Sequence, residues 1–353
     1  MSNRTHLVVM QGDGIGPEIT AATLHVLREA DKLLGLGLSF EDAVIGFDAL
    51  KKHGTTMPDA SFEAGKRADG VILGPVSHNA YPPRDQGGLN PSGEMRKRLD
   101  LYANIRPAKS RPGLPPRCGK PVDLVVVREN TEGLYADRNM FMGNGEFMPT
   151  PDVALAVRKI TRQGSTRIAE TAFKLAMQRP RKKVTSATKS NGIIHTMPYW
   201  DERFAAMAKN YPGVTTDQFH IDILCAHFVQ HPDWFDVVVG SNLFGDILSD
   251  LGPAVAGSIG IAPSANINPE RKFPSMFEPV HGSAPDIAGK GIANPLAAIL
   301  SGVLMLRHLG LEKSAQATQN AVVAVLKARA PRTPDLGGKD GTKDMSEAVL
   351  ALV

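Results

Sequence analysis

The sequence predicts an α/β fold. Short apolar runs rich in Val and Ile recur along the chain, and each is followed by a Gly or Pro loop and then by a helical pattern. Continuous apolar strands suit a sheet that is covered on both faces, and their alternation with helices is typical of α/β topology. The hydrophobic content of 42% and the charged content of 22% are those of an ordinary globular protein. A chain of 353 residues is long enough for about two domains.

Examples of these runs, which we expect to be strands, are 7–10, 70–73, 122–127, 184–187 and 235–239. The first helix is expected at 18–34, where apolar residues recur at near-helical spacing until Gly35 stops them. We expect Ser165 to cap a helix that runs to residue 178. Pro295 stands in the first turn of an apolar helix that ends at about residue 308.

The charge pattern does not indicate a nucleic-acid partner. The net charge is +4 and the isoelectric point is near 9.0, but Lys and Arg are spread along the chain. The one compact basic run, at 179–183, is typical of a solvated turn before a strand. Nucleic-acid binding stays open only as an alternative, and a steep salt dependence of RNA or DNA retention would be its mark.

We expect a cytoplasmic protein without membrane contact. The polar segment 1–6 leads directly into an apolar strand and leaves no room for a signal peptide. The longest apolar segment, at 296–306, has only about half of the ~20 residues that a membrane span requires. Cys118 and Cys225 lack zinc-site spacing and have no cysteine neighbour, which fits a reducing compartment.

Two carboxylates, Asp246 and Asp250, stand four residues apart just after an apolar strand. Residues i and i+4 of a helix face the same side, so both acids point to one region. Because two carboxylates held together repel, a bound divalent cation is the usual resolution. The pair also fits a helix start in which acids favour the N-terminal dipole. A third acid, Asp222, and a set of Arg, Tyr and Lys residues favour the metal interpretation.

The loop 11–18 lies between an expected strand and an expected helix and is rich in glycine. It resembles a dinucleotide-binding fingerprint, but Pro17 stands where that fingerprint needs its last Gly or Ala. The glycines permit a close approach of the backbone to a ligand, and a tight turn alone would also use them. The loop by itself therefore does not indicate a cofactor.

Three arginines occur near predicted strand or loop ends: Arg96, Arg106 and Arg128. Planar guanidinium groups at such ends can converge on a carboxylate, although each arginine alone also fits a surface ion pair. Tyr135 and Lys189 follow two of the expected strands, and both residue types transfer protons when their pKa is brought toward neutrality. Alone, each also fits a packed phenol or an exposed ammonium.

Together these segments resemble the β-decarboxylating 2-hydroxyacid dehydrogenases, the family of isocitrate, 3-isopropylmalate, homoisocitrate and tartrate dehydrogenases. The likeness runs from Gly12 to about Gly338 and rests on specific motifs in the family's order. These motifs are Gly-Asp-Gly-Ile-Gly-Pro-Glu, Leu-Asp-Leu-Tyr-Ala-Asn-Ile-Arg-Pro, Arg-Glu-Asn-Thr-Glu-Gly-Leu-Tyr, Asn-Leu-Phe-Gly-Asp-Ile-Leu-Ser-Asp and His-Gly-Ser-Ala-Pro-Asp-Ile-Ala-Gly.

The resemblance implies a two-domain α/β fold with a mixed sheet, as in isocitrate and isopropylmalate dehydrogenases, and not a true Rossmann fold. Residues 1–98 and 255–353 would form a large, cofactor-binding domain. Residues 99–254 would form a small domain for dimerisation and for substrate and metal binding. The segment at about 137–163 resembles the family's intersubunit clasp.

The resemblance also implies the roles of the site residues. Arg96, Arg106 and Arg128 would hold the two carboxylates of a malate core. Mg²⁺ or Mn²⁺ would be bound through oxygen by Asp246 and Asp250 of one subunit and Asp222 of its dimer mate. Lys189, also from the mate, would accept the hydroxyl proton, and Tyr135 would protonate the enolate that remains when CO2 departs. The active site would then exist only in the dimer.

The implied cofactor segment begins at Glu278. Asp286 matches the family position that receives the adenosine ribose, where a carboxylate accepts hydrogen bonds from a 2'-hydroxyl and repels a 2'-phosphate. The expected cofactor is therefore NAD and not NADP. Asp335 is a looser match to the same site. The expected cofactor-binding residues are Glu278, His281, Gly282, Ser283, Ala284, Pro285, Asp286 and Asn294.

One departure from the family concerns the substrate. Isopropylmalate enzymes have leucines just before the first substrate arginine, whereas this chain has Asn90 and Ser92. Isocitrate enzymes carry a Ser and an Asn at these two positions, and here the two types are exchanged. We therefore expect Asn90 and Ser92 to bind the substrate and to favour a polar 3-substituent. Pro91 and Gly93 can reshape this loop, so the sequence leaves the substrate open.

The sequence therefore predicts a homodimeric enzyme that oxidises and decarboxylates a 3-substituted malate of the isocitrate or isopropylmalate type with NAD. The partner would be a small hydroxy di- or tricarboxylic acid. Tartrate or D-malate dehydrogenase is one alternative. A non-catalytic regulatory subunit of an isocitrate dehydrogenase complex is another, although such subunits typically lose some of the residues that this chain retains. The pathway, the assembly beyond a dimer and the choice between Mg²⁺ and Mn²⁺ stay open.

Overall fold

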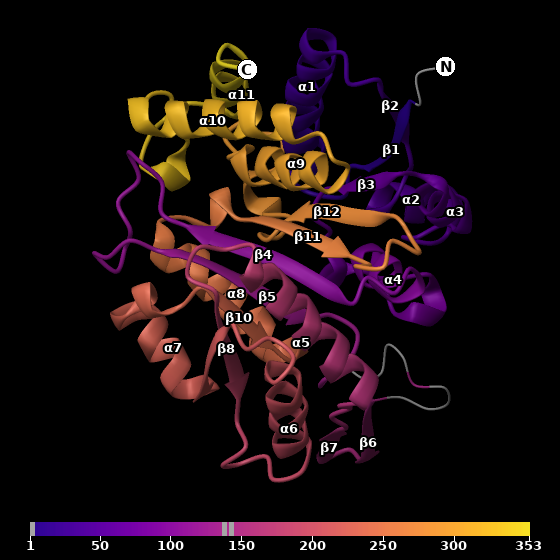
Figure 1. Cartoon of the computed structure of the whole chain (residues 1–353). Coiled ribbons are helices and arrows are strands. Elements are labelled where there is room, and N and C mark those ends of the chain that lie inside the picture. The colour runs from indigo at the N-terminus through magenta and orange to yellow at the C-terminus, as the bar shows by residue number, and fades with distance from the viewer. Residues whose placement is uncertain (1–3, 136–139, 141–144) are drawn as a thin grey trace. The chain divides into compact units, whose positions relative to one another are not determined.

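The computed structural model describes residues 4–135, 140 and 145–353, and the chain divides into two compact units. Unit 1 comprises Met1–Leu99, Arg111–Pro115 and Gly257–Val353, and unit 2 comprises Asp100–Ser110 and Pro116–Ala256. Each unit contains a mixed β-sheet flanked by helices (Figure 1). The predicted α/β class is confirmed. The short segment Arg111–Pro115 belongs with unit 1 and was expected in the other domain.

The sheet of unit 1 has the strand order β2-β1-β3-β12-β11. Its strands are parallel except for β11, which is antiparallel to β12. This order differs from that of a true Rossmann fold, as predicted. The strands are β1 (Thr5–Met10), β2 (Leu38–Asp42), β3 (Gly70–Leu73), β11 (Pro263–Ile267) and β12 (Ser275–Pro279).

Helices pack against this sheet. Helix α9 packs on β11 and β12 and contacts α1 and α10, α11 packs on α1 and α10, and α3 packs against β1. Gly35 ends α1 in the left-handed conformation, as the sequence predicted, and Pro295 immediately precedes α9. The helices are α1 (Gly16–Leu34), α2 (Gly46–His53), α3 (Asp59–Arg67), α4 (Pro91–Arg98), α9 (Leu296–His308), α10 (Glu312–Ala328) and α11 (Thr342–Leu350), with short 3-10 helices η1 (His78–Ala80), η2 (Arg84–Gln86), η5 (Ile259–Ile261), η6 (Pro285–Ile287) and η7 (Pro334–Leu336).

The sheet of unit 2 has the strand order β4-β5-β10-β8-β9. Strand β4 is antiparallel to β5, and the other neighbours are parallel. The central strands are nearly continuous buried apolar runs, which is why the sequence revealed them. The strands are β4 (Ala103–Lys109), β5 (Asp123–Glu129), β8 (Lys183–Thr188), β9 (Thr215–His220) and β10 (Val237–Gly240).

The helices of unit 2 are α5 (Arg162–Met177), α6 (Thr196–Ala208), α7 (Ile221–Gln230) and α8 (Asn242–Ala256), with the 3-10 helix η4 (Pro232–Trp234). Helix α8 packs on β4 and β5, and α5 packs on β5 and β10. The prediction that Ser165 caps α5 is wrong. Thr161 is the N-cap, and its hydroxyl accepts a hydrogen bond from Gly164 N, while Ser165 is buried inside the helix.

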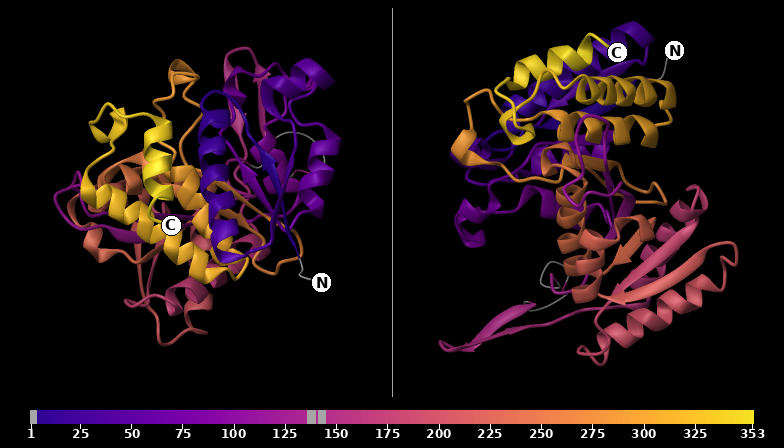
Figure 2. Two further views of the ribbon diagram at one scale, coloured as in Figure 1. Left: turned by 90° about the horizontal axis from the view of Figure 1, so that it is seen from above. Right: turned by 90° about the vertical axis from the view of Figure 1, so that its left-hand side faces the viewer.

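A two-stranded antiparallel hairpin extends from the rest of unit 2 (Figure 2). It consists of β6 (Glu146–Thr150) and β7 (Val153–Ala156), and every residue of both strands is exposed. The hairpin lies in the expected clasp segment 137–163, of which residues 137–139 and 141–144 are outside the described residues. Among the helices of the described part of the chain, none is both long enough and apolar enough to cross a membrane.

Candidate active site

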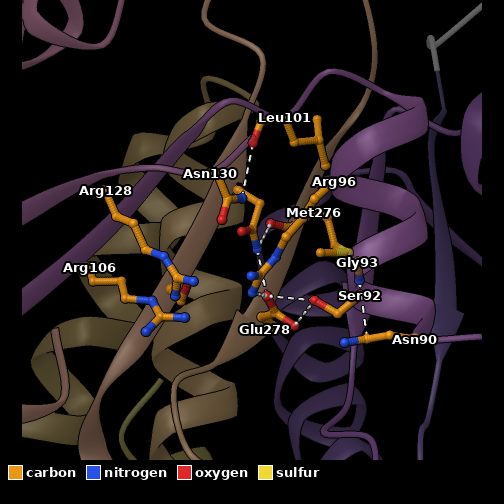
Figure 3. Close-up of polar contacts among 12 residues, drawn as sticks. Asn90, Ser92, Gly93, Arg96, Leu101, Arg106, Arg128, Asn130, Met276 and Glu278 are labelled. Atoms are coloured by element: carbon orange, nitrogen blue, oxygen red, sulfur yellow. Dashed lines mark hydrogen bonds and ion pairs between the residues drawn. The ribbon is translucent and has the colours of Figure 1, made fainter. Parts of the chain in front are cut away.

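Arg106 and Arg128 lie side by side on one face of the β4–β5 pair (Figure 3). The register places Asn104 opposite Arg128, and Arg106 follows two residues later on the same face of β4. Both arginine side chains are buried. Strand pairing therefore brings together two of the three arginines that were expected to bind the substrate.

Helix α8 supplies acids to these arginines. Asp246 forms ion pairs with Arg128 and, at 3.5 Å, with Arg106 Nη1. Asp250 lies one turn later, with its Oδ1 3.8 Å from Arg106 Nη1. Burial raises the pKa of Asp250, and the charge of Asp246 adds to this effect while both arginines oppose it. Asp246 and Asp250 thus lie one turn apart on a helix, as predicted. Their negative charges are paired with Arg106 and Arg128, which are far from them in sequence.

Two further side chains of α8 fix the arginines, and the sequence did not single them out. Asn242 Oδ1 accepts hydrogen bonds from Arg128 Nε at 2.9 Å and from Nη2 at 2.7 Å. Ser249 Oγ accepts a hydrogen bond from Arg106 Nη1 at 2.7 Å. Both residues lie on the same face of α8 as Asp246. The helical spacing that pointed to Asp246 and Asp250 could therefore have identified Asn242 and Ser249 as well.

Gly245 allows α8 to approach β5 this closely. A Cβ atom at Gly245 would lie 2.7 Å from Arg128 Cβ, which is closer than real Cβ atoms approach other atoms. The glycine is therefore required by the close approach of Arg128. Any larger residue at position 245 would collide with Arg128.

Tyr135 belongs to the same group of residues. It follows β5 in a turn, and its hydroxyl donates to Asp246 Oδ2 at 3.4 Å. The guanidinium carbon of Arg128 lies 6.0 Å from the centre of the Tyr135 ring. The structure therefore gathers Arg106, Arg128, Tyr135, Asp246 and Asp250 in unit 2.

Lys189 and Asp222 form a second group in unit 2. Lys189 follows β8, Asp222 lies in the first turn of α7, and their Nζ and Oδ2 atoms are 2.9 Å apart. The hydrogen bond from Lys189 holds the pKa of Asp222 below its usual value. Both side chains are partly accessible to solvent.

A three-carboxylate metal site is not assembled within one chain. In the described residues, no three His, Cys, Asp or Glu side chains form a group that could hold a metal ion. Asp246 and Asp250 present carboxylate oxygens, the ligand type that Mg²⁺ and Mn²⁺ prefer. The third carboxylate of the predicted site is not beside them in the same chain. The residues thus fit a divalent cation if Asp222 comes from a second chain.

Arg96 lies in unit 1, on α4, and is paired with Glu278 of β12 (Figure 3). Ser92 is buried, and its hydroxyl donates to both carboxylate oxygens of Glu278 at 3.2 Å and 3.0 Å. Asn90 is the N-cap of α4, and its Oδ1 accepts a hydrogen bond from Gly93 N at 3.1 Å. The Ser92 hydroxyl and the Asn90 side-chain oxygen are therefore engaged within unit 1.

The cofactor segment borders a pocket of ≈ 430 Å³ in unit 1. Its walls are largely apolar, and Asn294 and Asp335 supply polar atoms, with Asn294 Nδ2 3.0 Å from Asp335 Oδ2. Burial lowers the pKa of His281, which keeps its imidazole neutral near pH 7. Of the predicted cofactor residues, the pocket is lined by His281, Gly282, Ala284 and Asn294.

The other predicted cofactor residues lie outside the lining of this pocket. Asp286 is exposed on η6, between the lining residue Ala284 and the lining residue Ile287 on the adjacent turn. Ser283 is buried, and its carbonyl accepts a hydrogen bond from Ile15 N at 2.9 Å. Glu278 faces Arg96 instead. An apolar pocket with a few polar groups fits the adenosine part of a dinucleotide.

The glycine-rich loop packs against this segment. Gly14 has a φ of 58°, and a Cβ atom there would lie 2.1 Å from Ser283 O. Gly12 has a φ of 76° and similarly faces Pro75 O at 2.1 Å. Both glycines are therefore needed for contacts of the chain with itself, and the loop contributes Ile15 to the pocket wall.

The basic run at 179–183 forms a turn that leads into β8, as predicted, and the charges of Arg179, Arg181 and Lys183 are paired within unit 2. Arg179 forms ion pairs with Asp123 and Asp236, and Lys183 Nζ lies 2.7 Å from Asp217 Oδ2. These cations are thus largely balanced by neighbouring acids, which weakens the case for a nucleic-acid surface at this turn.

Comparison with known proteins identifies the family. The sequence profile of isocitrate/isopropylmalate dehydrogenase matches residues 6–349. The chain is 46% identical over 362 residues to D-malate dehydrogenase [decarboxylating] of Escherichia coli (strain K12), with 100% of this chain and 99% of that protein covered. It is 47% identical over 358 residues to tartrate dehydrogenase/decarboxylase of Pseudomonas putida, with 97% and 96% covered.

A solved structure supports the same conclusion. The crystal structure of isocitrate dehydrogenase from Methylococcus capsulatus has a TM-score of 0.88 and 37% sequence identity, and 98% of each chain is covered. The chain therefore belongs to the isocitrate/isopropylmalate dehydrogenase family of decarboxylating dehydrogenases, which confirms the predicted family and enzyme class.

Proposed function

We propose that the protein is an NAD-dependent enzyme that oxidises and decarboxylates an unbranched four-carbon 2-hydroxy dicarboxylate of the D-malate or tartrate type. The observation that carries this choice is the engagement of Asn90 and Ser92. A third substrate carboxylate, as in isocitrate, needs hydrogen-bond donors. Ser92 donates its proton to Glu278, and Asn90 uses its Oδ1 to cap α4, so that of these two residues only the Asn90 amide N–H groups are left as donors. The names of the D-malate and tartrate relatives agree with this choice.

The chemistry proposed for this substrate uses the residues of both groups in unit 2. Arg106, Arg128 and, from unit 1, Arg96 bind the two carboxylates. Lys189 accepts the proton of the C2 hydroxyl while the C2 hydrogen leaves as hydride, and the bond between C3 and the departing carboxylate then breaks to release CO2. Tyr135 protonates C3, which yields the 2-oxo acid.

NAD, when bound, accepts the hydride, and Asp286 is proposed to face its 2'-hydroxyl. A divalent cation held by Asp246, Asp250 and a second chain's Asp222 would supply a Lewis acid for the charge that develops on the substrate oxygen. Asp246 and Asp250 also lie against the substrate arginines. The arginines and the cation would together bring positive charge to the negatively charged hydroxy acid.

We propose a homodimer with shared active sites. Lys189 and Asp222 are expected to act in the mate's site, and within one chain they contact each other. Exposed apolar side chains lie on the helices that carry the acids, with Ile223 on α7 and Ile247 on α8. The hairpin likewise exposes Phe147 and Leu155. Such surfaces are typical of an interface between subunits.

A substrate panel tests the proposed function. D-malate, tartrate, isocitrate, 3-isopropylmalate and homoisocitrate are assayed with NAD and Mn²⁺ by NADH absorbance. We expect kcat/KM for D-malate or tartrate to exceed that for isocitrate at least about tenfold, because the Ser92 hydroxyl already donates to Glu278 and is lost as a donor for a third carboxylate. A preference for isocitrate would contradict the substrate assignment. Absence of turnover with every acid would favour a regulatory subunit.

A further inference from the structure

Glu278, near the end of β12, accepts hydrogen bonds from side chains of α4 and β11 (Figure 3). Arg96 Nη2 forms an ion pair with Glu278 Oε1, and Asn266 Nδ2 of β11 lies 2.8 Å from the same oxygen. Ser92 Oγ donates to Oε2 at 3.0 Å. The carboxylate thus accepts hydrogen bonds from charged and neutral donors of unit 1.

The four residues are shielded from water. The side chains of Arg96 and Glu278 are 12% and 9% exposed. Ser92 and Asn266 are buried. An ion pair with little solvent contact holds its geometry more strictly than a surface pair, because water competes weakly for either partner. Glu278 therefore restrains one edge of the Arg96 guanidinium.

The local sequence explains why both contacts come from one helix. Ser92 and Arg96 are four residues apart on α4 and so lie on one face of that short helix. Asn90 caps its start, and the apolar Met95 is fully buried beside the charged face. Helix α4 is consequently held against β12 through the carboxylate of Glu278.

We propose that Glu278 is a positioning residue for Arg96 and not a ligand of the cofactor. It fixes one edge of the guanidinium, so that a substrate carboxylate meets an arginine that is already oriented. Ser92 and Asn266 in turn fix Glu278. This inference rests on the proposed function, in which Arg96 binds a carboxylate of the hydroxy acid.

The experiment compares Glu278→Gln with wild type in two independent measurements. The KM for the hydroxy acid is determined at saturating NAD, and the Kd for NADH is determined by fluorescence titration without substrate. We expect Glu278→Gln to raise the hydroxy-acid KM about tenfold with kcat changed less than about threefold, because the lost ion pair loosens substrate binding. The Kd for NADH should stay within about twofold of wild type.

A double-mutant cycle tests whether Glu278 acts through Arg96. If it does, Arg96→Ala combined with Glu278→Gln should have the same hydroxy-acid KM as Arg96→Ala alone, because the partner that Glu278 orients is gone. Ser92→Ala should raise the KM about threefold, and equally for every hydroxy acid that is turned over, because Ser92 contacts Glu278 and not the substrate.

Glu94→Gln is the matched control, because it makes the same change on the same helix in a carboxylate that pairs with the exposed Arg84 at 3.2 Å. Its KM and Kd should equal those of wild type. Additive effects in the double mutant, or a Glu278→Gln variant with weakened NADH binding and an unchanged hydroxy-acid KM, would overturn the inference. Failure of the wild-type enzyme to turn over any hydroxy acid would instead contradict the proposed function.

Discussion

The ammonium of Lys189 lies 2.9 Å from the carboxylate of Asp222 in the same chain. Tyr135 and Asp246 form a different group, with the Tyr135 hydroxyl 3.4 Å from Asp246 Oδ2. The proposed mechanism needs Lys189 and Tyr135 on one substrate. The two groups can serve one reaction if each chain contributes the Lys189 group to the site of its partner.

Mixed dimers test this shared site. Lys189→Ala and Tyr135→Phe are each expected to be inactive. In a heterodimer of the two variants, one of the two sites would contain both native groups, so mixing after partial unfolding and refolding should restore up to about a quarter of wild-type activity. Two tags and sequential affinity purification confirm the heterodimers. No recovery in confirmed heterodimers would exclude a site that is shared in this way.

Replacement of Asp246 tests the proposed metal site. Asp246→Asn keeps the shape of the side chain but removes the charge that would bind a cation, so Mn²⁺ affinity should fall by about tenfold or more and turnover should nearly vanish. Mn²⁺ binding is measured by isothermal titration calorimetry. Asp59→Asn, in an exposed side chain of α3, is the control. Unchanged Mn²⁺ affinity in Asp246→Asn would show that Asp246 is not a ligand.

Sequence patterns predicted those site residues whose positions follow from helical spacing or from the end of an apolar strand. The spacing of Asp246 and Asp250 on a helix and the position of Arg128 at the end of an apolar strand both became contacts in the structure. The strands that the sequence did not reveal include β2 and β9, which lie at the ends of their units' strand orders and are not continuous apolar runs. Continuous apolar runs therefore miss edge strands, and they also miss β12, which is buried but contains the polar residues Ser275 and Glu278.

The failures concern partners that are distant in sequence. The residue types at Asn90 and Ser92 show that polar groups exist, but not that the Ser92 hydroxyl donates to Glu278 or that the Asn90 oxygen caps α4. Ser165 and Thr161 are equally acceptable caps by composition. Thr161 takes that role because Glu132 accepts a hydrogen bond from its backbone N at 2.9 Å and so holds it at the helix start. Such choices depend on tertiary contacts that no local pattern contains.

Cofactor choice can be tested at Asp286, which is exposed beside the pocket of unit 1. Asp286→Lys should change the ratio of kcat/KM for NADP to kcat/KM for NAD by about tenfold or more toward NADP, because a 2'-phosphate would meet a cation in place of an anion. Asp48→Lys, an equally exposed charge reversal on α2, should leave the ratio unchanged. A wild-type preference for NADP would contradict the role of Asp286.

Gly245 offers a steric test of the arginine pair. In Gly245→Ala the new methyl group would lie 2.7 Å from Arg128 Cβ, so Arg128 or α8 must move. We expect a loss of about 1–3 kcal/mol in the free energy of unfolding and a hydroxy-acid KM raised about tenfold. In Gly213→Ala, no described atom lies within 4 Å of the new Cβ, and φ is outside the left-handed region. A Gly245→Ala enzyme with unchanged KM would disprove the requirement for close contact.

The stability of the fold should depend on the ionisation of Glu129. This residue is fully buried at the end of β5, and burial raises its pKa to about 7, with the charge of Glu132 adding to the effect and hydrogen bonds from Thr131 opposing it. The folded state therefore binds a proton that the unfolded state releases near pH 4.5. Stability from this group is complete below that pH and is lost as the pH rises toward 7.

Glu129→Gln removes this titration, although it also changes the hydrogen bonds that Glu129 accepts from Thr131 N and Glu132 N. Because the pKa of Glu129 rises from 4.5 to about 7 on folding, the free energy of unfolding of wild type minus that of Glu129→Gln should decrease by about 1–3 kcal/mol between pH 5 and pH 8. Urea unfolding at each pH measures it. Glu170→Gln, in a solvent-facing pair with Lys174, should show a constant difference. A constant difference for Glu129→Gln as well would mean that Glu129 has an ordinary pKa in the folded protein.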